Sequence, residues 1–188
     1  MKKLILISAL LFSFNGWAYS ETDLEKLKAT NACEGCDLSG ANLAFAKLQK
    51  ANLREANLRN ANLRKAYLDE ANLQKANLTK ANLGFAKMRL TNLREANLQR
   101  AKLHGADLRR ADLRNSNFHY AEIYGADLQG VDLRGADLSQ VIIDRTGETT
   151  SKDWGYVSSF NRAIYCKTKM PSGEVNDDCE NEDLEETE

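Results

Sequence analysis

The chain has 188 residues, of which 43% are hydrophobic, 28% charged and only 7% aromatic, with a formal net charge of −1 at pH 7. These values are typical of a soluble folded domain and exclude an intrinsically disordered chain. Because aromatic residues are few and there is a single proline, the interior must be built from many small contributions.

The start of the chain, over positions 1–18, has the order of a secretory signal. Lys2 and Lys3 precede an apolar stretch over residues 4–14, and the small residues Gly16 and Ala18 follow it. We expect cleavage after Ala18, with Ser20 as the second choice. A membrane anchor is the less favoured alternative because the apolar run is short for a bilayer, and no stable membrane insertion is expected after cleavage. The sequence therefore predicts a periplasmic or secreted protein of bacterial type.

Residues 19–35 are predicted to form an N-terminal capping segment. Thr22 and Glu25 match the T-x-x-E capping box, which marks the start of a helix. Leu24 and Leu27 would lie on one side of a short helix that ends near Thr30. This helix is expected to cover the start of the segment that follows.

Residues 36–145 are 22 unbroken pentapeptide units. The first position is Ala in 17 of them, the second is Asn or Asp in 16, and the third is Leu in 18. A period of five fits neither a helix face nor a strand alternation, whereas a chain that turns a corner once in every unit would keep the leucines on one side. The first and third positions are predicted to point inward. The second would hydrogen-bond the backbone at the corner, and the last two would face solvent.

This pattern resembles the pentapeptide repeat family, whose consensus is A-[DN]-L-x-x. The resemblance implies an all-β fold, a right-handed quadrilateral β-helix with four repeats per coil, so that every fourth repeat lies on the same face. A short helical cap would close its N-terminal end and an irregular cap its C-terminal end. One inner column at this spacing reads Leu38, Leu58, Leu78, Leu98, Phe118 and Leu138, which supports the period.

Residues 146–188 are predicted to form the C-terminal cap and an acidic tail. The cap is expected to be an apolar plug made of Trp154, Tyr156, Phe160, Ile164 and Tyr165. The segment over residues 166–179 resembles a closing cysteine motif of some exported pentapeptide repeat proteins, as does the opening E-G-C-D-L-S-G at residues 34–40.

The chain has four cysteines, an even number that an exported protein can pair in disulfides. The Met-Pro-Ser-Gly turn at residues 170–173 lets the chain double back, so we expect Cys166 to pair with Cys179 and to stabilise the cap by about 3 kcal/mol. Cys33 and Cys36 are also disulfide candidates, whose state is left open. A redox role for this C-x-x-C pair is disfavoured because it opens a solenoid rather than a helix in a βαβ unit.

The sequence contains no catalytic constellation. It has neither a G-x-S-x-G motif nor a phosphate-binding glycine loop, and its serines are few. His104 and His119 occupy outward fourth positions on different faces, where solvated side chains are expected. We therefore predict that the protein is not an enzyme and has no catalytic, cofactor-binding or metal-binding residues.

The charge of the repeats bears on two further hypotheses, occupation of DNA-binding enzymes in place of DNA and binding of an anionic polymer. Some pentapeptide repeat proteins resemble duplex DNA, which requires a strongly negative rod, but residues 36–145 hold 18 Lys and Arg against 12 Asp and Glu. DNA mimicry is therefore unlikely here. The opposite idea is a binder of anionic polymers or envelope surfaces, because one outer column carries four guanidinium groups. The column consists of Arg54, Arg94, Arg114 and Arg134. A merely solvated face is favoured, since Glu55 and Glu95 lie beside two of these arginines.

A second outer feature combines rings and cations at one corner. Three consecutive second positions in one column depart from Asn or Asp, and the adjacent column of fifth positions carries two phenylalanines. The six residues are Phe45, Lys47, Lys65, Tyr67, Phe85 and Lys87. Self-contained cation–π stacking is the favoured interpretation and a contact patch the alternative.

The predicted function is an exported, non-catalytic scaffold that binds an unidentified protein partner, with the anionic polymer as the alternative partner. Both ends of the solenoid are expected to be capped, so we expect a monomer.

Overall fold

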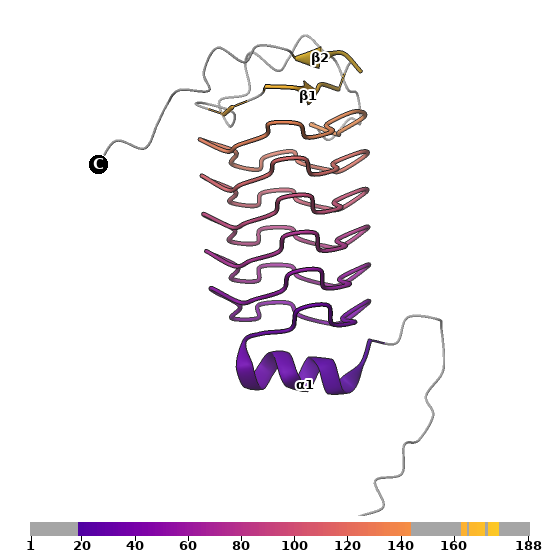
Figure 1. The fold of residues 1–188 in the computed structure, drawn as a ribbon, viewed down its shortest axis with the longest axis vertical. Coiled ribbons are helices and arrows are strands. Elements are labelled where there is room, and N and C mark those ends of the chain that lie inside the picture. Colours follow the sequence, from indigo (N-terminus) through magenta and orange to yellow (C-terminus); the bar gives the residue numbers. More distant parts are fainter. Residues whose placement is uncertain (1–18, 144–162, 165, 172, 177–188) are drawn as a thin grey trace, which may run out of the picture.

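The computed structural model describes residues 19–143, 163–164, 166–171 and 173–176. These residues form a stack of similar coils with one helix, α1 (Glu21–Thr30), beneath the first coil. At the other end lies a hairpin of β1 (Thr168–Lys169) and β2 (Val175–Asn176), as Figure 1 shows. The predicted signal peptide and most of the predicted C-terminal plug lie outside the described residues. No helix of the described residues is long and apolar enough to cross a membrane.

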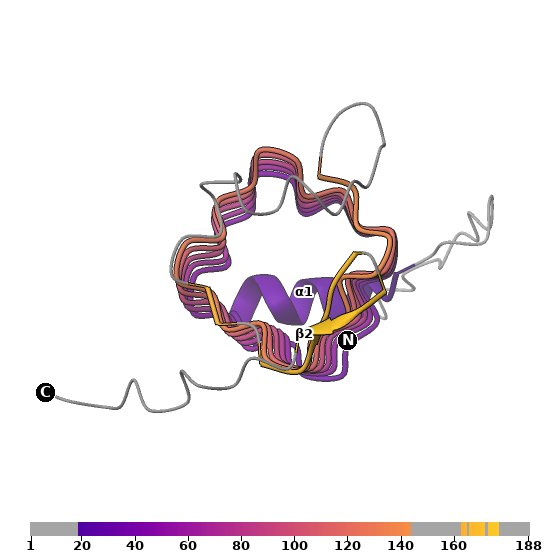
Figure 2. The same cartoon turned by 90° about the horizontal axis from the view of Figure 1, so that it is seen from above.

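Parallel bridges join each coil to the next. Asn42 pairs with Asn62, and Tyr67 pairs with Lys87, so each residue pairs with its counterpart four repeats later and each coil holds four repeats. The prediction of a β-helix with little helix is confirmed. Seen from above in Figure 2, the coils superimpose into one closed outline. This register is what aligns residues of successive coils into columns.

The first and third positions of the repeats point inward, as predicted. The Leu at the third position and the Ala at the first position are buried throughout the middle coils, and Leu78 has no exposed surface. At the second position, Asn62 Oδ1 accepts a hydrogen bond of 3.2 Å from the Arg64 backbone N–H. The fifth position has a left-handed backbone, with φ of 57° at Lys65. The sequence does not predict this last feature, because most of the fifth residues are neither Gly nor Asn.

The helix of the N-terminal cap begins earlier than predicted. Ser20, not Thr22, is the N-cap, and its Oγ accepts a hydrogen bond of 3.2 Å from the Asp23 backbone N–H. The backbone of Ser20 is extended, as an N-cap requires, whereas Thr22 already lies in the helix. The helix ends at Thr30, as predicted, and Leu27 is buried against the first coil.

The bridges begin before the predicted start of the repeats at residue 36. Ala32 pairs with Asn52, so residues 31–35 form a further repeat whose third position is Cys33. At the other end, Ile164 pairs with Asp132 and Lys169 pairs with Asp137. The segment that follows residue 162 therefore extends two faces of the last coil. Of the residues predicted for the apolar plug, the described part of the chain includes Ile164. The others, Trp154, Tyr156, Phe160 and Tyr165, lie outside it.

Candidate functional site

The structure places a groove at the corner where the ring-bearing and lysine-bearing columns meet. We call it the corner groove. It has a volume of about 550 Å³. Its lining residues are Phe45, Arg64, Lys65, Tyr67, Phe85 and Lys87. Five of the six residues of the predicted patch therefore come together around one hollow.

One residue of the predicted patch, Lys47, pairs with Tyr67 but does not line the corner groove, and one lining residue was missed. Lys47 borders a different groove, at the N-terminal end of the solenoid. Arg64 is a fourth-position residue, and its guanidinium carbon lies 5.6 Å from the centre of the Phe85 ring. Its position directly before Lys65, on the face that bears Phe45 and Phe85, is the signal in the sequence that could have indicated it.

Cations and rings alternate across the corner groove. Lys65 Nζ lies 5.7 Å from the centre of the Phe45 ring, and Lys87 Nζ lies 4.9 Å from the centre of the Tyr67 ring. Each of these contacts joins neighbouring coils, because the paired residues are four repeats apart in the sequence. Phe45 and Phe85 nevertheless remain 59% and 47% exposed. The cation–π contacts therefore leave much of the ring surface open to solvent.

The unusual second positions change the local turn. At Asn62 the side chain accepts the N–H of the residue two positions later, but Lys87 cannot accept it. In the Lys87 repeat, Asp69 Oδ1 from the preceding coil accepts the Arg89 backbone N–H at 3.2 Å instead. The turn is thus maintained while the Lys87 side chain remains available to the groove.

Two glycines and a histidine position the Phe85 ring. The ring contacts His104 edge-on, with centroids 5.1 Å apart. A Cβ at Gly105 would lie 2.6 Å from two Phe85 ring atoms, and a Cβ at Gly84 would lie 2.6 Å from the His104 ring. His104 also stacks on Tyr124 at 5.4 Å. The absence of side chains at both glycines therefore allows this ladder of rings to pack.

The prediction that both histidines are simply solvated is wrong. Both are half-buried, and His119 Nδ1 lies 2.8 Å from the Ser139 Oγ. His104 is held between Phe85 and Tyr124. Side chains at outward positions stack along the columns, so a ring can be covered by its neighbours in the next coils.

The corner groove is cationic. No carboxylate lines it, and Arg64, Lys65 and Lys87 form no ion pair within the part of the chain that the structure describes. Carboxylates appear in the neighbouring hollow of about 430 Å³, which Asp69 and Asp107 border together with Lys87. The groove can therefore offer three positive charges and three ring surfaces to a ligand.

The predicted basic column is largely neutralised by its own neighbours. Arg54 forms ion pairs with Glu34 and Glu55 at 2.6 and 2.7 Å. The hydrogen bond to Glu34 is the main cause that raises the pKa of Arg54, and the same bond lowers the pKa of Glu34. Arg94 lies in the same column, and no ion pair of its guanidinium occurs among the described residues.

The two remaining arginines of the column are also paired with carboxylates. Arg114 donates two hydrogen bonds to Asp112, which raise the pKa of Arg114. Arg134 Nη2 lies 2.7 Å from Asp132 Oδ2. Three of the four guanidinium groups in this column are therefore already occupied within the protein.

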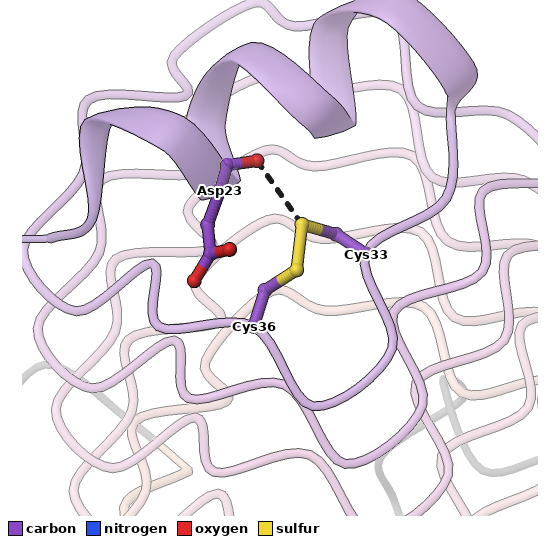
Figure 3. A group of neighbouring side chains, drawn as sticks. All are labelled: Asp23, Cys33 and Cys36. Carbon is purple, nitrogen blue, oxygen red and sulfur yellow. Dashed lines mark hydrogen bonds between the residues drawn. A yellow bond between two sulfur atoms is a disulfide. The ribbon is translucent and has the colours of Figure 1, made fainter.

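A disulfide lies under the N-terminal cap. Cys33 and Cys36 are joined, and both are buried beneath α1, as Figure 3 shows. Cys33 Sγ also lies 3.1 Å from the Asp23 carbonyl oxygen. The two sulfur atoms and the Asp23 carboxylate lie within 4.8 Å of one another, as in a small metal site. In the disulfide, however, neither sulfur is a thiolate, the form that binds metal.

The predicted disulfide of the C-terminal cap is only partly within the described residues. Cys166 is buried and disulfide-bonded. Cys179 lies outside the described residues. The pairing of these two cysteines therefore stays a prediction.

Comparison with solved structures finds other pentapeptide repeat proteins. A pentapeptide repeat protein, Rfr23, from the cyanobacterium Cyanothece 51142 is 30% identical, with a TM-score of 0.57, over 61% of this chain and 92% of that one. A pentapeptide repeat protein from the Arabidopsis thaliana thylakoid lumen is 26% identical, with a TM-score of 0.41, over 62% and 71%. HetL from Nostoc sp. strain PCC 7120, described as involved in heterocyst differentiation regulation, is 28% identical, with a TM-score of 0.30, over 73% and 75%. No curated protein matches the sequence.

The model of the family described as pentapeptide repeats matches eight copies in this chain. The matches cover residues 36–74, 56–94 and 91–130, which together span half of the 188 residues. The repeat pattern, the coil of four repeats and this match agree. The chain therefore belongs to the pentapeptide repeat family.

Proposed function

We propose that the protein is an exported, non-catalytic scaffold that binds a partner protein through the corner groove. The observation that carries this proposal is the groove itself, which combines three rings and three cations without a lining carboxylate. Elsewhere on the solenoid, several cations pair with carboxylates of their own or a neighbouring coil, as Lys50 does with Glu70. Export follows from the signal predicted in residues 1–18.

Stacking within the protein does not account for the whole cluster. Each cation–π contact of the groove joins a cation to a ring one coil away, yet Phe45 and Phe85 stay largely exposed. The consensus Asn at the second position would supply a turn hydrogen bond that Tyr67 gives up, whereas in the Lys87 repeat Asp69 replaces it. Exposed rings in place of a turn hydrogen bond are expected where the surface contacts another molecule.

The composition of the corner groove defines the partner surface. Rings require apolar or planar groups opposite them, and the ammonium and guanidinium groups require carboxylates. We therefore expect the partner to present an apolar side chain surrounded by Asp or Glu. Rings at the centre of such a contact would supply most of the binding free energy.

Binding of anionic polymers through the arginine column is less well supported. Arg54, Arg114 and Arg134 are engaged by carboxylates of the protein, and a polymer would have to displace these ion pairs. The column would also offer the polymer little net charge, because the paired carboxylates screen the guanidinium groups.

A double substitution tests the corner groove without changing the fold. Tyr67→Asn restores the consensus residue, and Phe85→Lys introduces a residue found at other fifth positions with the same backbone, such as Lys65 and Lys75. We expect the unfolding free energy to change by about 1 kcal/mol or less. Recovery of the partner from an envelope extract should be lost, because the central rings are gone.

Tyr120→Asn is the matched control. Tyr120 is also an exposed ring at a fifth position, and Arg100 lies 5.6 Å from its ring centre, but it belongs to a different face. This variant should recover the partner as the unchanged protein does. If the double variant still recovered the partner at full strength, the corner groove would not be the contact site. A steep loss of binding with added salt would then favour the arginine column.

A further inference from the structure

The cap closes only two of the four faces at the N-terminal end of the solenoid. On one face, Thr30 Oγ1 both accepts the Ala32 N–H and donates to the Ala32 carbonyl. On the next, Asp23 and Ser20 bind the N–H and the carbonyl of Asp37. Figure 2 shows α1 crossing beneath one half of the coil outline.

The other two faces, residues 41–50, end in an unpaired strand edge. In inner coils the second-position N–H donates to the preceding coil, as Asn62 donates to the Ala41 carbonyl at 2.9 Å. For Asn42 and Lys47, within the described residues, neither the N–H nor the carbonyl has such a partner, and the Ala44 carbonyl also lacks one. Gln49 is satisfied, because its carbonyl accepts from Asn31 Nδ2 at 2.8 Å. We call residues 42–47 the open edge.

A groove of about 380 Å³ lies beside the open edge. Its apolar lining includes Leu27, Leu43, Ala46 and Leu48, and Lys28 and Lys47 border it. We call it the N-terminal groove. Ala46 is partly exposed here, whereas Ala66 and Ala86 of the same column are fully buried. The first coil therefore lacks on these faces the layer that buries every later coil.

The charges of the N-terminal groove are of one sign. Its two charged lining residues are Lys28 and Lys47, and no carboxylate lines it. An occupant must thus supply a backbone strand, an apolar side chain and a negative charge. We propose that the open edge binds an extended segment of a partner protein in which an acidic residue directly precedes a leucine, and that this segment adds a partial coil to the solenoid. This proposal does not rest on the corner groove.

The spacing of the solenoid sets the register of the added strand. The inner coils show that a third-position N–H donates to the second-position carbonyl of the following coil, as Leu43 does to Asn62. A segment docked on the open edge would place its acidic residue opposite Lys47 and donate its leucine N–H in the same way to the Lys47 carbonyl. Its leucine side chain would enter the apolar groove, and the preceding carboxylate would lie near Lys47. The N–H of that acidic residue would point away from the protein.

A synthetic decapeptide tests this arrangement. The probe is two copies of Ala-Asp-Leu-Gln-Gly, the sequence of residues 126–130, with a fluorescent label. Fluorescence anisotropy with the purified full chain should show saturable binding. N-methylation of both leucine nitrogens removes the pairing donors and should weaken binding about tenfold or more. N-methylation of both aspartate nitrogens should change binding less than about twofold, because those groups face away.

Two second-position lysines provide matched protein variants. Lys47→Glu reverses the charge at the open edge and should weaken peptide binding about tenfold. Lys102→Glu makes the same change in an inner coil outside both grooves, where the backbone N–H already donates to Ala81, and should leave peptide binding unchanged. The proposal is overturned if the parent peptide shows no binding at about 1 mM, or if the two methylated peptides bind alike. It is equally overturned if sedimentation shows that two copies of the chain occlude the edge and the peptide does not separate them.

Discussion

Asp23 Oδ2 accepts a hydrogen bond of 2.9 Å from the Asp37 backbone N–H. In the inner coils the same kind of N–H donates to a carbonyl oxygen of the preceding coil. The Asp23 carboxylate, carried by α1, therefore substitutes for a strand that the first coil lacks. The Ser20 N–H completes the replacement by donating to the Asp37 carbonyl at 3.0 Å.

Removal of this carboxylate should loosen the cap. Asp23→Ala leaves the Asp37 N–H without its acceptor, so we expect a loss of about 0.5 to 2 kcal/mol in the free energy of unfolding. Chemical denaturation of the variant measures it. Glu25→Ala, on the exposed side of the same helix, should change the free energy little. An equal loss in both variants would mean that the interaction of these carboxylates with the helix dipole, not the bond to Asp37, is responsible.

The inward third position should not tolerate a charge. Leu78 has no exposed surface, so Leu78→Lys would place an ammonium group among apolar side chains without a partner. We expect the cooperative thermal transition to be lost or lowered strongly. Leu90→Lys is the control, because Leu90 is 48% exposed at a fifth position, where other lysines occur. A Leu78→Lys variant that melted like the unchanged protein would contradict the inward orientation.

The repeat made most of the fold predictable. Only a coil of fixed period keeps Ala, Leu and Asn in the same environments, so the buried columns could be assigned from the sequence. The start of α1 was less predictable, because Ser20 and Thr22 both have the hydroxyl that an N-cap needs. The choice between them depends on the contact of Ser20 with Asp37, which is far along the chain.

For the candidate sites, the sequence predicted which residues lie close together only where the repeat register places them in one column or in adjacent columns. Phe45, Lys65 and Phe85 occupy one column, so their proximity followed from the period of four repeats. Arg64 was missed because the direction of a long side chain across a corner is set by packing rather than by register. The open edge was missed for another reason: the extent to which α1 covers the first coil follows from its orientation, which the sequence pattern does not contain.

Peptide mapping without reduction tests both disulfides. Trypsin should release residues 29–47 as one peptide that contains Cys33 and Cys36, and the disulfide should make it lighter by two hydrogens. Residues 163–167 and 170–188 should remain linked through Cys166 and Cys179 until a reductant is added. Free thiols at the last two positions would contradict the predicted pairing.

One ion pair should give the solenoid a measurable acid sensitivity. Arg109 donates two hydrogen bonds to Asp107, and these bonds are the main cause that lowers the pKa of Asp107 below its ordinary value of 3.8. Because the folded pKa is depressed, the stabilisation is present above about pH 4 and is lost as the pH falls through the lower folded value.

Arg109→Gln should therefore raise the pKa of Asp107, as followed by NMR of the carboxyl carbon. The variant should lose about 1 kcal/mol or less at pH 7, since the pair is partly exposed, and less still at pH 2. Arg110→Gln, at the adjacent position, serves as the control. An unchanged Asp107 titration in Arg109→Gln would show that the pair does not persist in solution.

Alanine substitutions at two glycines of one column can distinguish the effect of backbone strain from the effect of displacing the Phe85 ring. Gly105 and Gly125 both have a positive φ, 65° and 66°, so replacement by Ala costs each of them a similar backbone penalty of about 1 kcal/mol. Only at Gly105 would the new Cβ meet Phe85, at 2.6 Å, whereas at Gly125 the nearest atom is 3.9 Å away. Gly105→Ala should therefore push the ring away from His104 and change the shape of the corner groove.

NMR should show a larger shift of the His104 ring protons in Gly105→Ala than in Gly125→Ala, because His104 lies edge-on to Phe85 at 5.1 Å. Partner recovery should fall in Gly105→Ala alone, and equal recovery with both variants, despite a displaced ring, would remove Phe85 from the proposed contact.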